Sequence, residues 1–225
     1  YITGGNNVTV AGLFSNNVAT TNGGAIYTDS SFSIVANNSE TVFTGNTANA
    51  LSNAIYVNAS TSVTIRMNAT NNGTIRFDDA IQGANKYNIA INGDNYDDKV
   101  IFNNLIQNAN ISIDNITVSI NAAGLDLTPF GVESILDNSV VTLNSGVLEL
   151  NTVTVDAWTT KDASASNLVV NPNSQSIPYL TIANSKVNLS NENAADVTTN
   201  LCNDIYMGIL NSNANNEFSI DVAFS

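Results

Sequence analysis

The chain has 225 residues and a net charge of -13, and its six Lys and Arg residues are scattered rather than clustered. Binding to a phosphate backbone needs a basic patch, so this composition argues against nucleic acid as a partner. Hydrophobic residues make up 43% of the chain, and its 40 asparagines supply polarity without charge, so the chain is expected to fold rather than stay disordered. No apolar run reaches the length of about 18 residues that spans a membrane.

Short runs of alternating apolar and polar residues, rich in Val and Ile, follow one another along the chain. A period of two over four or five residues predicts β-strands, and the Asn, Asp, Gly and Ser residues between the runs favour tight turns. No stretch predicts a helix. The expected strands lie at 8–10, 32–34, 63–65, 74–77, 89–91, 100–102, 111–113, 117–120, 140–143, 147–150, 153–155, 168–170, 180–182, 186–189 and 218–222.

The first part of the chain contains a motif that recurs after 29 positions. Self-similarity at a fixed period of this length is typical of a chain that stacks copies of one small unit. Gly23 and Gly24 stand in the first copy where Ser52 and Asn53 stand in the second. The matched pairs are Phe14 and Phe43, Asn17 and Asn46, Ala19 and Ala48, Ala25 and Ala54, Ile26 and Ile55, and Tyr27 and Tyr56.

Many short strands are compatible with an antiparallel sandwich or barrel, with a parallel β-solenoid, or with an irregular all-β domain. The dipeptides Asn72-Gly73 and Asn92-Gly93 are candidate hairpin turns, which would favour the antiparallel architecture. The fixed offset favours the solenoid, because residues one coil apart then lie above each other at the strand spacing of about 4.8 Å. We therefore predict an all-β fold built as a parallel β-solenoid.

In a solenoid the recurring apolar residues have a structural role. Phe14 and Phe43 would form an internal aromatic stack, and Ile26 and Ile55 an aliphatic one, so that each coil covers the core of its neighbour. The recurring alanines, which are Ala19, Ala25, Ala48 and Ala54, fit corners that are too tight for larger side chains.

The recurring polar residues are expected at turns. Asn17 and Asn46 could form a ladder, because an amide both donates and accepts and so satisfies its neighbour, which a charged residue could not do. Gly23 and Gly24 would occupy a turn with positive φ. Asn53 would replace them in the second copy, since Asn tolerates the left-handed region.

Over residues 14–56, in "FSNNVATTNGGAIY" and "FTGNTANALSNAIY", the chain resembles the FxxN and GGAI repeats of chlamydial-type polymorphic outer membrane proteins and related autotransporter adhesins. The resemblance implies a right-handed parallel β-helix passenger that is exported through a C-terminal β-barrel and displayed on the cell surface. It also implies that such a barrel, which no part of this sequence matches, anchors the protein. The second copy departs from the GGAI pattern at Ser52-Asn53.

We expect one continuous solenoid over residues 1–225, cut from a longer protein. Residues 1–77 would form regular coils of the FxxN/GGAI type. Residues 78–225 keep the rhythm of strands and turns with longer insertions, so they would form divergent coils.

Enzymatic chemistry has few candidate residues. The absence of His removes the commonest general base and the imidazole metal ligand. Two carboxylates are enough for glycoside hydrolysis, and the candidates are Asp78, Asp79, Asp94, Asp97 and Asp98. Adjacent Asp residues on a strand point to opposite faces, so solvated turns are the better interpretation and no catalytic residue is predicted.

Three further features have weak functional interpretations. Asp94, Asp97 and Asp98 could give weak Ca²⁺ binding, although an Asx-rich turn explains them as well. Trp158 could stack on a sugar or a partner from a loop, but packing is the simpler role. Cys202 is expected to be a small buried apolar residue rather than a reactive thiol. No cofactor is expected.

The sequence and the resemblance together predict a non-catalytic, bacterial, surface-displayed passenger segment that acts as an adhesin or a structural stalk. Its partner would be a host-surface or neighbouring-cell protein or glycan. Two alternatives remain at this stage: a carbohydrate-active β-helix enzyme, either a polysaccharide lyase or a hydrolase, and a structural component of an S-layer or a phage fibre.

Overall fold

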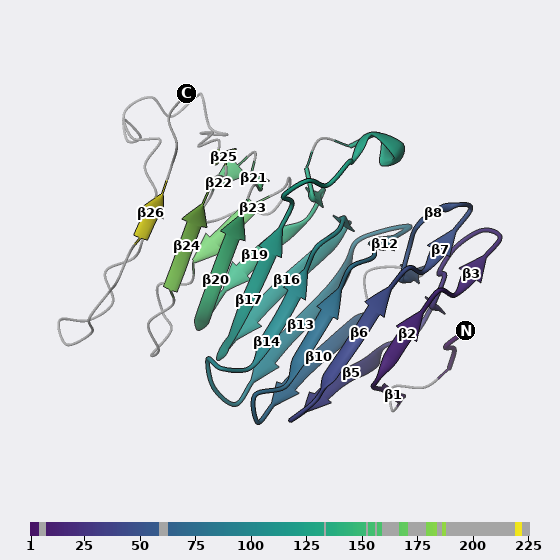
Figure 1. Cartoon of the computed structure of the whole chain (residues 1–225), viewed down its shortest axis with the longest axis horizontal. Helices are drawn as coiled ribbons and strands as arrows, with labels where there is room; N and C mark the ends of the chain where they lie inside the picture. The colour runs from purple at the N-terminus through teal and green to yellow at the C-terminus, as the bar shows by residue number, and fades with distance from the viewer. Residues whose placement is uncertain are drawn as a thin grey trace.

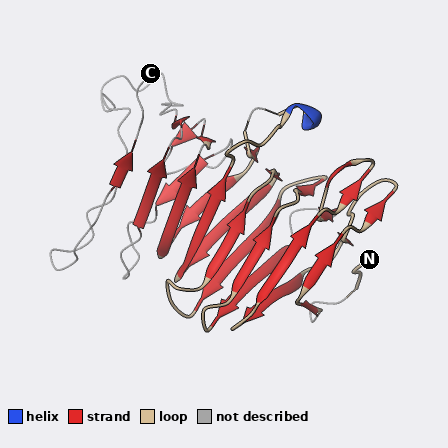
Figure 2. Ribbon diagram, viewed as in Figure 1, coloured by secondary structure: helices blue, strands red, loops and turns tan. Residues whose placement is uncertain are grey.

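The structure is a computed structural model of the whole chain, and it describes residues 1–4, 8–58, 63–132, 134–151, 153–155, 157–158, 167–170, 179–183, 186–187 and 219–221. Short strands lie side by side in long rows that follow the longest axis of the molecule (Figures 1 and 2). Within the described residues the regular structure is almost entirely β, which confirms the predicted parallel β-solenoid.

Three parallel sheets run along the solenoid, and the strands of each follow one another in a fixed spatial order. Sheet 1 contains β1 (Thr9–Val10), β5 (Phe32–Asn37), β10 (Thr64–Thr70), β13 (Tyr87–Gly93), β16 (Ala109–Asp114), β19 (Val140–Leu143), β23 (Asn167–Val170) and β22 (Ala157–Trp158). Sheet 2 contains β2 (Leu13–Ser15), β6 (Glu40–Thr44), β11 (Thr74–Phe77), β14 (Lys99–Phe102), β17 (Ile116–Asn121), β20 (Gly146–Asn151), β24 (Tyr179–Ala183) and β26 (Ser219–Asp221). Sheet 3 contains β18 (Leu136–Asp137), β15 (Ile106–Gln107), β12 (Ile81–Gly83), β9 (Ile55–Val57) and β4 (Ile26–Thr28).

The remaining elements lie outside these three sheets. A small fourth sheet contains β3 (Val18–Ala19), β7 (Thr47–Ala48) and β8 (Leu51–Ser52). A two-stranded ladder joins β21 (Thr154–Val155) to β25 (Lys186–Val187), and one 3₁₀ turn, η1, covers Thr128–Phe130.

Each of the first five coils visits sheet 1, then sheet 2, then sheet 3. The paired strands are therefore separated by a whole coil, and their pairing is parallel, as in β5 with β10 and β6 with β11. The described strands include one antiparallel pair, the local hairpin of β7 and β8. A sandwich or barrel of hairpins would show the opposite pattern.

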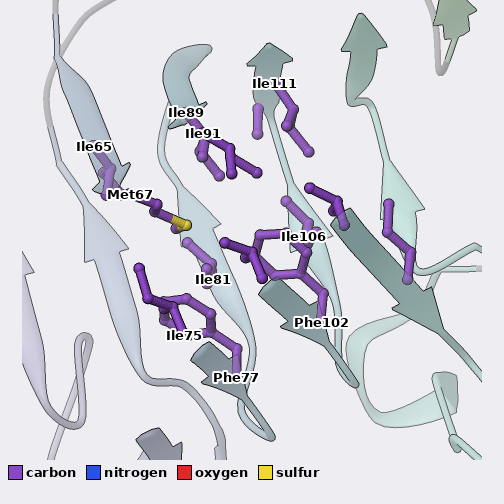
Figure 3. Close-up of a cluster of buried hydrophobic side chains, with 14 of the residues drawn as sticks. Ile65, Met67, Ile75, Phe77, Ile81, Ile89, Ile91, Phe102, Ile106 and Ile111 are labelled. Atoms are coloured by element: carbon purple, nitrogen blue, oxygen red, sulfur yellow. The ribbon is translucent and has the colours of Figure 1, made fainter. Parts of the chain in front are cut away.

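The alternation of each strand places its apolar side chains inside the solenoid. In β5, Phe32, Ile34 and Ala36 are buried, whereas Ser33 and Val35 between them are partly exposed. Figure 3 shows the result in the middle coils, where side chains from the three sheets, such as Met67, Ile75 and Ile81, meet in one interior. Stacking of coils thus creates a single continuous apolar core.

Inside the core, residues one coil apart form columns along the axis. Because the ladders are parallel and in register, an inward position in one coil lies beside an inward position in the next. One column of sheet 1 contains Ile34, Met67, Ile91, Ile113 and Leu143. In sheet 2 a column contains Phe14, Phe43, Phe77, Phe102, Ile120 and Leu150, and in sheet 3 a column contains Ile26, Ile55, Ile81, Ile106 and Leu136.

Asparagine forms many of the corners. Nine non-glycine residues among those described have positive φ, and all except Ala50 are Asn. Asn is well suited to this left-handed conformation, which explains part of the unusual composition. Asn72 of the candidate dipeptide Asn72-Gly73 has φ +64° and lies at the corner between β10 and β11. That dipeptide is therefore a coil corner and not the hairpin turn that the antiparallel alternative requires.

Tyr87 is the largest fully buried side chain of the described residues. Its ring lies so close to Gly83 that a Cβ there would come within 2.6 Å of the ring carbon Cδ1. The Tyr87 hydroxyl has no hydrogen-bond partner, and burial raises its pKa far above the ordinary value of 10.0. A phenol therefore occupies an apolar site where a phenyl ring would fit better.

Candidate functional site

The recurring phenylalanines lie in a stacked aromatic column. The ring centroids of Phe14 and Phe43 are 4.6 Å apart with an interplanar angle of 6°, and those of Phe43 and Phe77 are also 4.6 Å apart. Phe102 follows Phe77 at 5.6 Å. The sequence repeat covered only the first two rings, whereas the column extends over four coils.

The corner between this Phe column and the Ile column of sheet 3 has two forms. In the first two coils the isoleucine follows the phenylalanine by twelve positions, as in Phe14 to Ile26. In the third and fourth coils it follows by only four, as in Phe77 to Ile81. We call the first form the lobed corner, because residues 17–24 and 46–53 project as the lobe that carries β3, β7 and β8, and the second form the compact corner.

A polar column, buried at Asn46 and Asp79, supports the lobed corners. Asn17 Nδ2 donates to Asn46 Oδ1 at 2.7 Å, and Asn46 Nδ2 donates to Asp79 Oδ2 at 2.7 Å. The Asp79 carboxylate, 5% exposed, also accepts from the backbone N–H groups of Gly45 and Asn46. The predicted ladder of Asn17 and Asn46 is therefore present, and the carboxylate of Asp79, which only accepts, ends this chain of amide donors.

The glycine pair and its replacement do not share a conformation. Gly23 has φ +67°, but Gly24 does not have a positive φ, and a Cβ on Gly24 would lie 2.6 Å from the Asn53 carbonyl oxygen. Gly24 is therefore required for close approach of two chain segments. The prediction that Asn53 supplies a left-handed turn is wrong: Ser52 lies in β8, and Asn53 uses its side-chain Oδ1 to accept from the Gly23 N–H at 3.0 Å.

The left-handed residues of the second lobe lie three and four positions before Asn53. Asn49 (φ +49°) and Ala50 (φ +63°) form the two-residue turn between β7 and β8. Two consecutive positive φ values are typical of the tight hairpin turn that matches the twist of its strands. The second lobe is therefore a hairpin, and β3 of the first lobe pairs with it along β7.

The recurring alanines divide between lobe and core. Ala19 pairs with Ala48 in the fourth sheet. Ala54 is fully buried, and its carbonyl accepts from the Ala25 N–H at 3.1 Å, so these two residues stack where the lobe rejoins sheet 3. Tyr27 and Tyr56, which follow the isoleucines, point outward from sheet 3, and their ring centroids are 5.8 Å apart.

The lobe carries exposed apolar side chains. Val18 is 78% exposed and Leu51 36% exposed, and Leu13 on the neighbouring strand β2 is 69% exposed. Such residues are unfavourable in water, although single exposed ones are common. Val18 and Leu51 come from two different coils, and the lobe brings them onto one projecting sheet.

A second insertion interrupts the fifth coil between sheets 2 and 3. It contains η1 and extends from the same edge of the solenoid as the lobe (Figure 1). Asp126 accepts hydrogen bonds from the backbone N–H and the hydroxyl of Thr128, and these bonds hold the pKa of Asp126 below its ordinary value. Both insertions therefore project from one edge of the solenoid, where the chain passes from a strand of sheet 2 to a strand of sheet 3.

The carboxylates proposed for glycoside hydrolysis have structural partners. Asp79 lies in the buried polar column, whereas Asp78 forms a salt bridge with Arg76 at 2.9 Å and accepts from Asn103 Nδ2 at 2.9 Å. Neighbouring carboxylates thus point to different surroundings. The structure offers no converging pair at these positions.

The acidic turn at 94–98 is held together by one of its own residues. Asp98 is fully buried and accepts from the backbone N–H groups of Asn72, Asp94 and Asn95 at 2.8 to 3.1 Å. Asp94 and Asp97 are exposed. The three bonds to the Asp98 carboxylate support the interpretation as an Asx-rich turn. In the described part of the chain no three acidic, His or Cys side chains come together as a metal site.

Other residues noted from the sequence lie outside the described side chains. The backbone of Trp158 belongs to β22, but its side chain is not described, and Cys202 falls outside the described residues altogether. Among the residues that the structure describes, none of the helical segments has the length and apolar character needed to cross a bilayer.

The fold and the decorated edge define a repeat protein of the β-solenoid class. Residues 12–29, which contain β2, β3 and the first lobe, match the model of the Chlamydia polymorphic membrane protein repeat. Proteins of that family are associated with the outer membrane and the cell surface, so the match supports a coarse assignment to the surface. No curated protein and no solved structure matches the chain.

Proposed function

We propose that this chain is one continuous passenger segment of a longer, surface-displayed bacterial protein, and that it acts as an adhesin without catalysis. The observation that carries the proposal is the lobe of residues 17–24 and 46–53, because its first half lies within the matched repeat at residues 12–29 and the lobe presents exposed apolar residues. The solenoid below it would be the stalk that holds the lobe away from the cell.

The arrangement of rigid and projecting parts supports this division. The core columns are continuous and buried, which suits a rod. Recognition residues are most often found on loops that a rigid scaffold positions, and both insertions of this solenoid project from one edge. The partner would be a protein or glycan of a host or neighbouring cell. The rest of the longer protein would anchor the chain to the cell that displays it.

Binding to cells tests the proposal directly. Beads coated with the full chain are incubated with monolayers of cultured animal cells, and attached beads are counted with and without soluble chain as competitor. We expect saturable attachment that the soluble chain displaces. Attachment equal to that of uncoated beads would contradict the adhesin role.

A matched pair of variants locates the contact. The double substitution Val18→Asp and Leu51→Asp changes two exposed lobe residues and should abolish attachment. Val8→Asp changes a valine that is 36% exposed and lies outside the lobe, and it should leave attachment unchanged. Because all three positions are exposed, the thermal unfolding of both variants is expected to stay close to that of the original chain. Equal attachment by both variants would place the contact elsewhere.

A further inference from the structure

Three tyrosines form a column on the outer face of sheet 3. Tyr27 pairs in register with Tyr56, and the ring centroids are 5.8 Å apart with an interplanar angle of 18°. Tyr1 lies on the other side of Tyr27, with centroids 5.3 Å apart, because Ile2 pairs with Thr28 as a further parallel rung. Unlike the phenylalanine column, this one faces solvent: Tyr1 is 73% exposed, and Tyr27 and Tyr56 are partly exposed.

Neighbouring phenols at this separation favour one reaction. One-electron oxidation of a phenol gives a phenoxyl radical whose unpaired electron is shared with the ring carbons next to the oxygen. Two such radicals held side by side combine far faster than two that must meet by diffusion. The Tyr1 hydroxyl also donates to Asp29 Oδ2 at 2.5 Å, so a carboxylate is in place to take the phenolic proton as the electron leaves.

We propose that Tyr1, Tyr27 and Tyr56 form an oxidative cross-linking site, at which a heme peroxidase with hydrogen peroxide joins adjacent rings as dityrosine. Each of two phenols gives up one electron and its hydroxyl proton, and a carbon–carbon bond forms between the ring carbons next to the oxygens. The hydrogens on those two carbons return to the oxygens as the rings regain aromaticity. The product has lost two hydrogens, and the peroxide is reduced to two waters.

Tyr87 lacks these conditions, because its ring is fully buried in the core. A bond between Tyr27 and Tyr56 would join β4 to β9, and a bond between Tyr1 and Tyr27 would join the first residue to β4. Either link would add a covalent tie across neighbouring coils.

The test uses the full chain at high dilution, treated with a heme peroxidase and limiting hydrogen peroxide. Monomer is isolated and digested with a protease that cleaves at acidic residues. Asp29 and Glu40 lie between Tyr27 and Tyr56, so a link between these tyrosines appears as two covalently joined peptides. No acidic residue separates Tyr1 from Tyr27, so their link appears as one peptide that has lost two hydrogens.

Two substitutions decide the outcome. Tyr27→Phe removes the shared member of both pairs while keeping an aromatic ring, and we expect loss of both products and of the dityrosine fluorescence of the monomer. Tyr96→Phe should leave both products unchanged. The proposal is overturned if Tyr27→Phe retains the monomer product, if the links map to other tyrosines, or if only links between molecules form. Circular dichroism before oxidation checks that both variants are folded.

Discussion

The lobed corners of the first two coils and the compact corners of the next two differ in length but not in what they connect. In both forms the chain leaves the Phe column of sheet 2 and enters the Ile column of sheet 3. Phe43 and Phe77 stack at 4.6 Å although one precedes a lobe and the other does not. The eight additional residues of a lobed corner are therefore accommodated outside the core.

The comparison of lobed and compact corners shows which residues of the repeat are needed for the core. The Phe and Ile positions persist in the compact corners as Phe77-Asp78-Asp79-Ala80-Ile81 and Phe102-Asn103-Asn104-Leu105-Ile106. Gly23 and Gly24 have no equivalents there, since they belong to the lobe, whereas Asp79 takes the place of Asn in the polar column. The core thus needs the columns, and the lobe is an addition that depends on its own polar contacts.

The largest effect is expected from the shared aromatic column. Phe77→Ala removes a buried ring that stacks with both neighbours and should lower the free energy of unfolding by about 3–5 kcal/mol in urea titrations. Phe43→Ala should cost a similar amount, because lobed and compact coils share the column. Phe14→Ala, with one stacked neighbour and a half-buried ring, should cost less. A much larger cost at Phe43 would mean that the lobe is part of the core.

The next largest loss of stability is expected at Asp79, a compact-corner residue that accepts hydrogen bonds from the second lobed corner. Asp79→Ala removes the acceptor of the Gly45 N–H, the Asn46 N–H and Asn46 Nδ2, and buried donors without partners should reduce stability by about 2–4 kcal/mol. Asp79→Asn, which keeps an acceptor oxygen, should cost less. The exposed Asp97→Asn serves as control. Equal stability of the alanine and control variants would contradict the polar column.

Deletion of both lobes tests the comparison itself. Removing residues 17–24 and 46–53 converts each lobed corner to the five-residue compact form, with Ala25-Ile26 or Ala54-Ile55 at its end. We expect a folded β-protein whose stability falls by about 1–2 kcal/mol, mainly through lost hydrogen bonds to Asp79. Far-ultraviolet circular dichroism and urea unfolding measure this. An unfolded product would show that the lobes are required for stacking.

A smaller change of opposite sign is expected at Tyr87. Tyr87→Phe removes a buried hydroxyl without a partner and should raise the free energy of unfolding by about 1–2 kcal/mol. Tyr56→Phe, on the outer column, should change stability by less than about 0.5 kcal/mol. A destabilised Tyr87→Phe variant would mean that the hydroxyl makes a favourable contact.

The smallest effect concerns the contact between Tyr1 and Asp29 at the start of the chain. The hydrogen bond from Tyr1 lowers the pKa of Asp29 below 3.8, so this stabilisation is present above that value and is lost as the pH falls through the folded pKa. The same bond raises the pKa of Tyr1 above 10.0, so it is present below 10.0 and lost as the pH rises through the folded pKa. Nuclear Overhauser contacts between the Tyr1 and Tyr27 rings should weaken at both extremes. In Tyr1→Phe these contacts should not depend on pH.

The sequence predicted those parts of the fold that depend on pattern. Period-two runs locate strands because burial alternates along a strand, and a fixed offset predicts coil stacking because parallel strands in register align like residues. The compact corners escaped detection, since a change in the offset from Phe to Ile from twelve positions to four breaks a fixed period while leaving both columns intact. The motif F-x-x-A/L-I in the third and fourth coils was the available signal.

Contacts between distant polar groups could not be predicted in the same way. Asp79 replaces Asn in the polar column, and identity at a fixed offset cannot detect a partner of different chemistry. Asn53 supports its neighbours through its side chain and not through its backbone conformation, a distinction that residue type alone does not make. Whether the Tyr87 hydroxyl has a hydrogen-bond partner depends on every group around its oxygen atom, and a sequence pattern does not show these groups.

The direction of the backbone hydrogen bonds has a mechanical consequence. In parallel sheets that stack along one axis, the bonds between coils are aligned with that axis. Tension applied to the two ends therefore strains the ladder of a terminal coil before that of an interior coil, so the rod should peel one coil at a time and extend in steps. A dityrosine bridge between Tyr27 and Tyr56 would hold one of these steps closed and shorten the reach of the stretched chain.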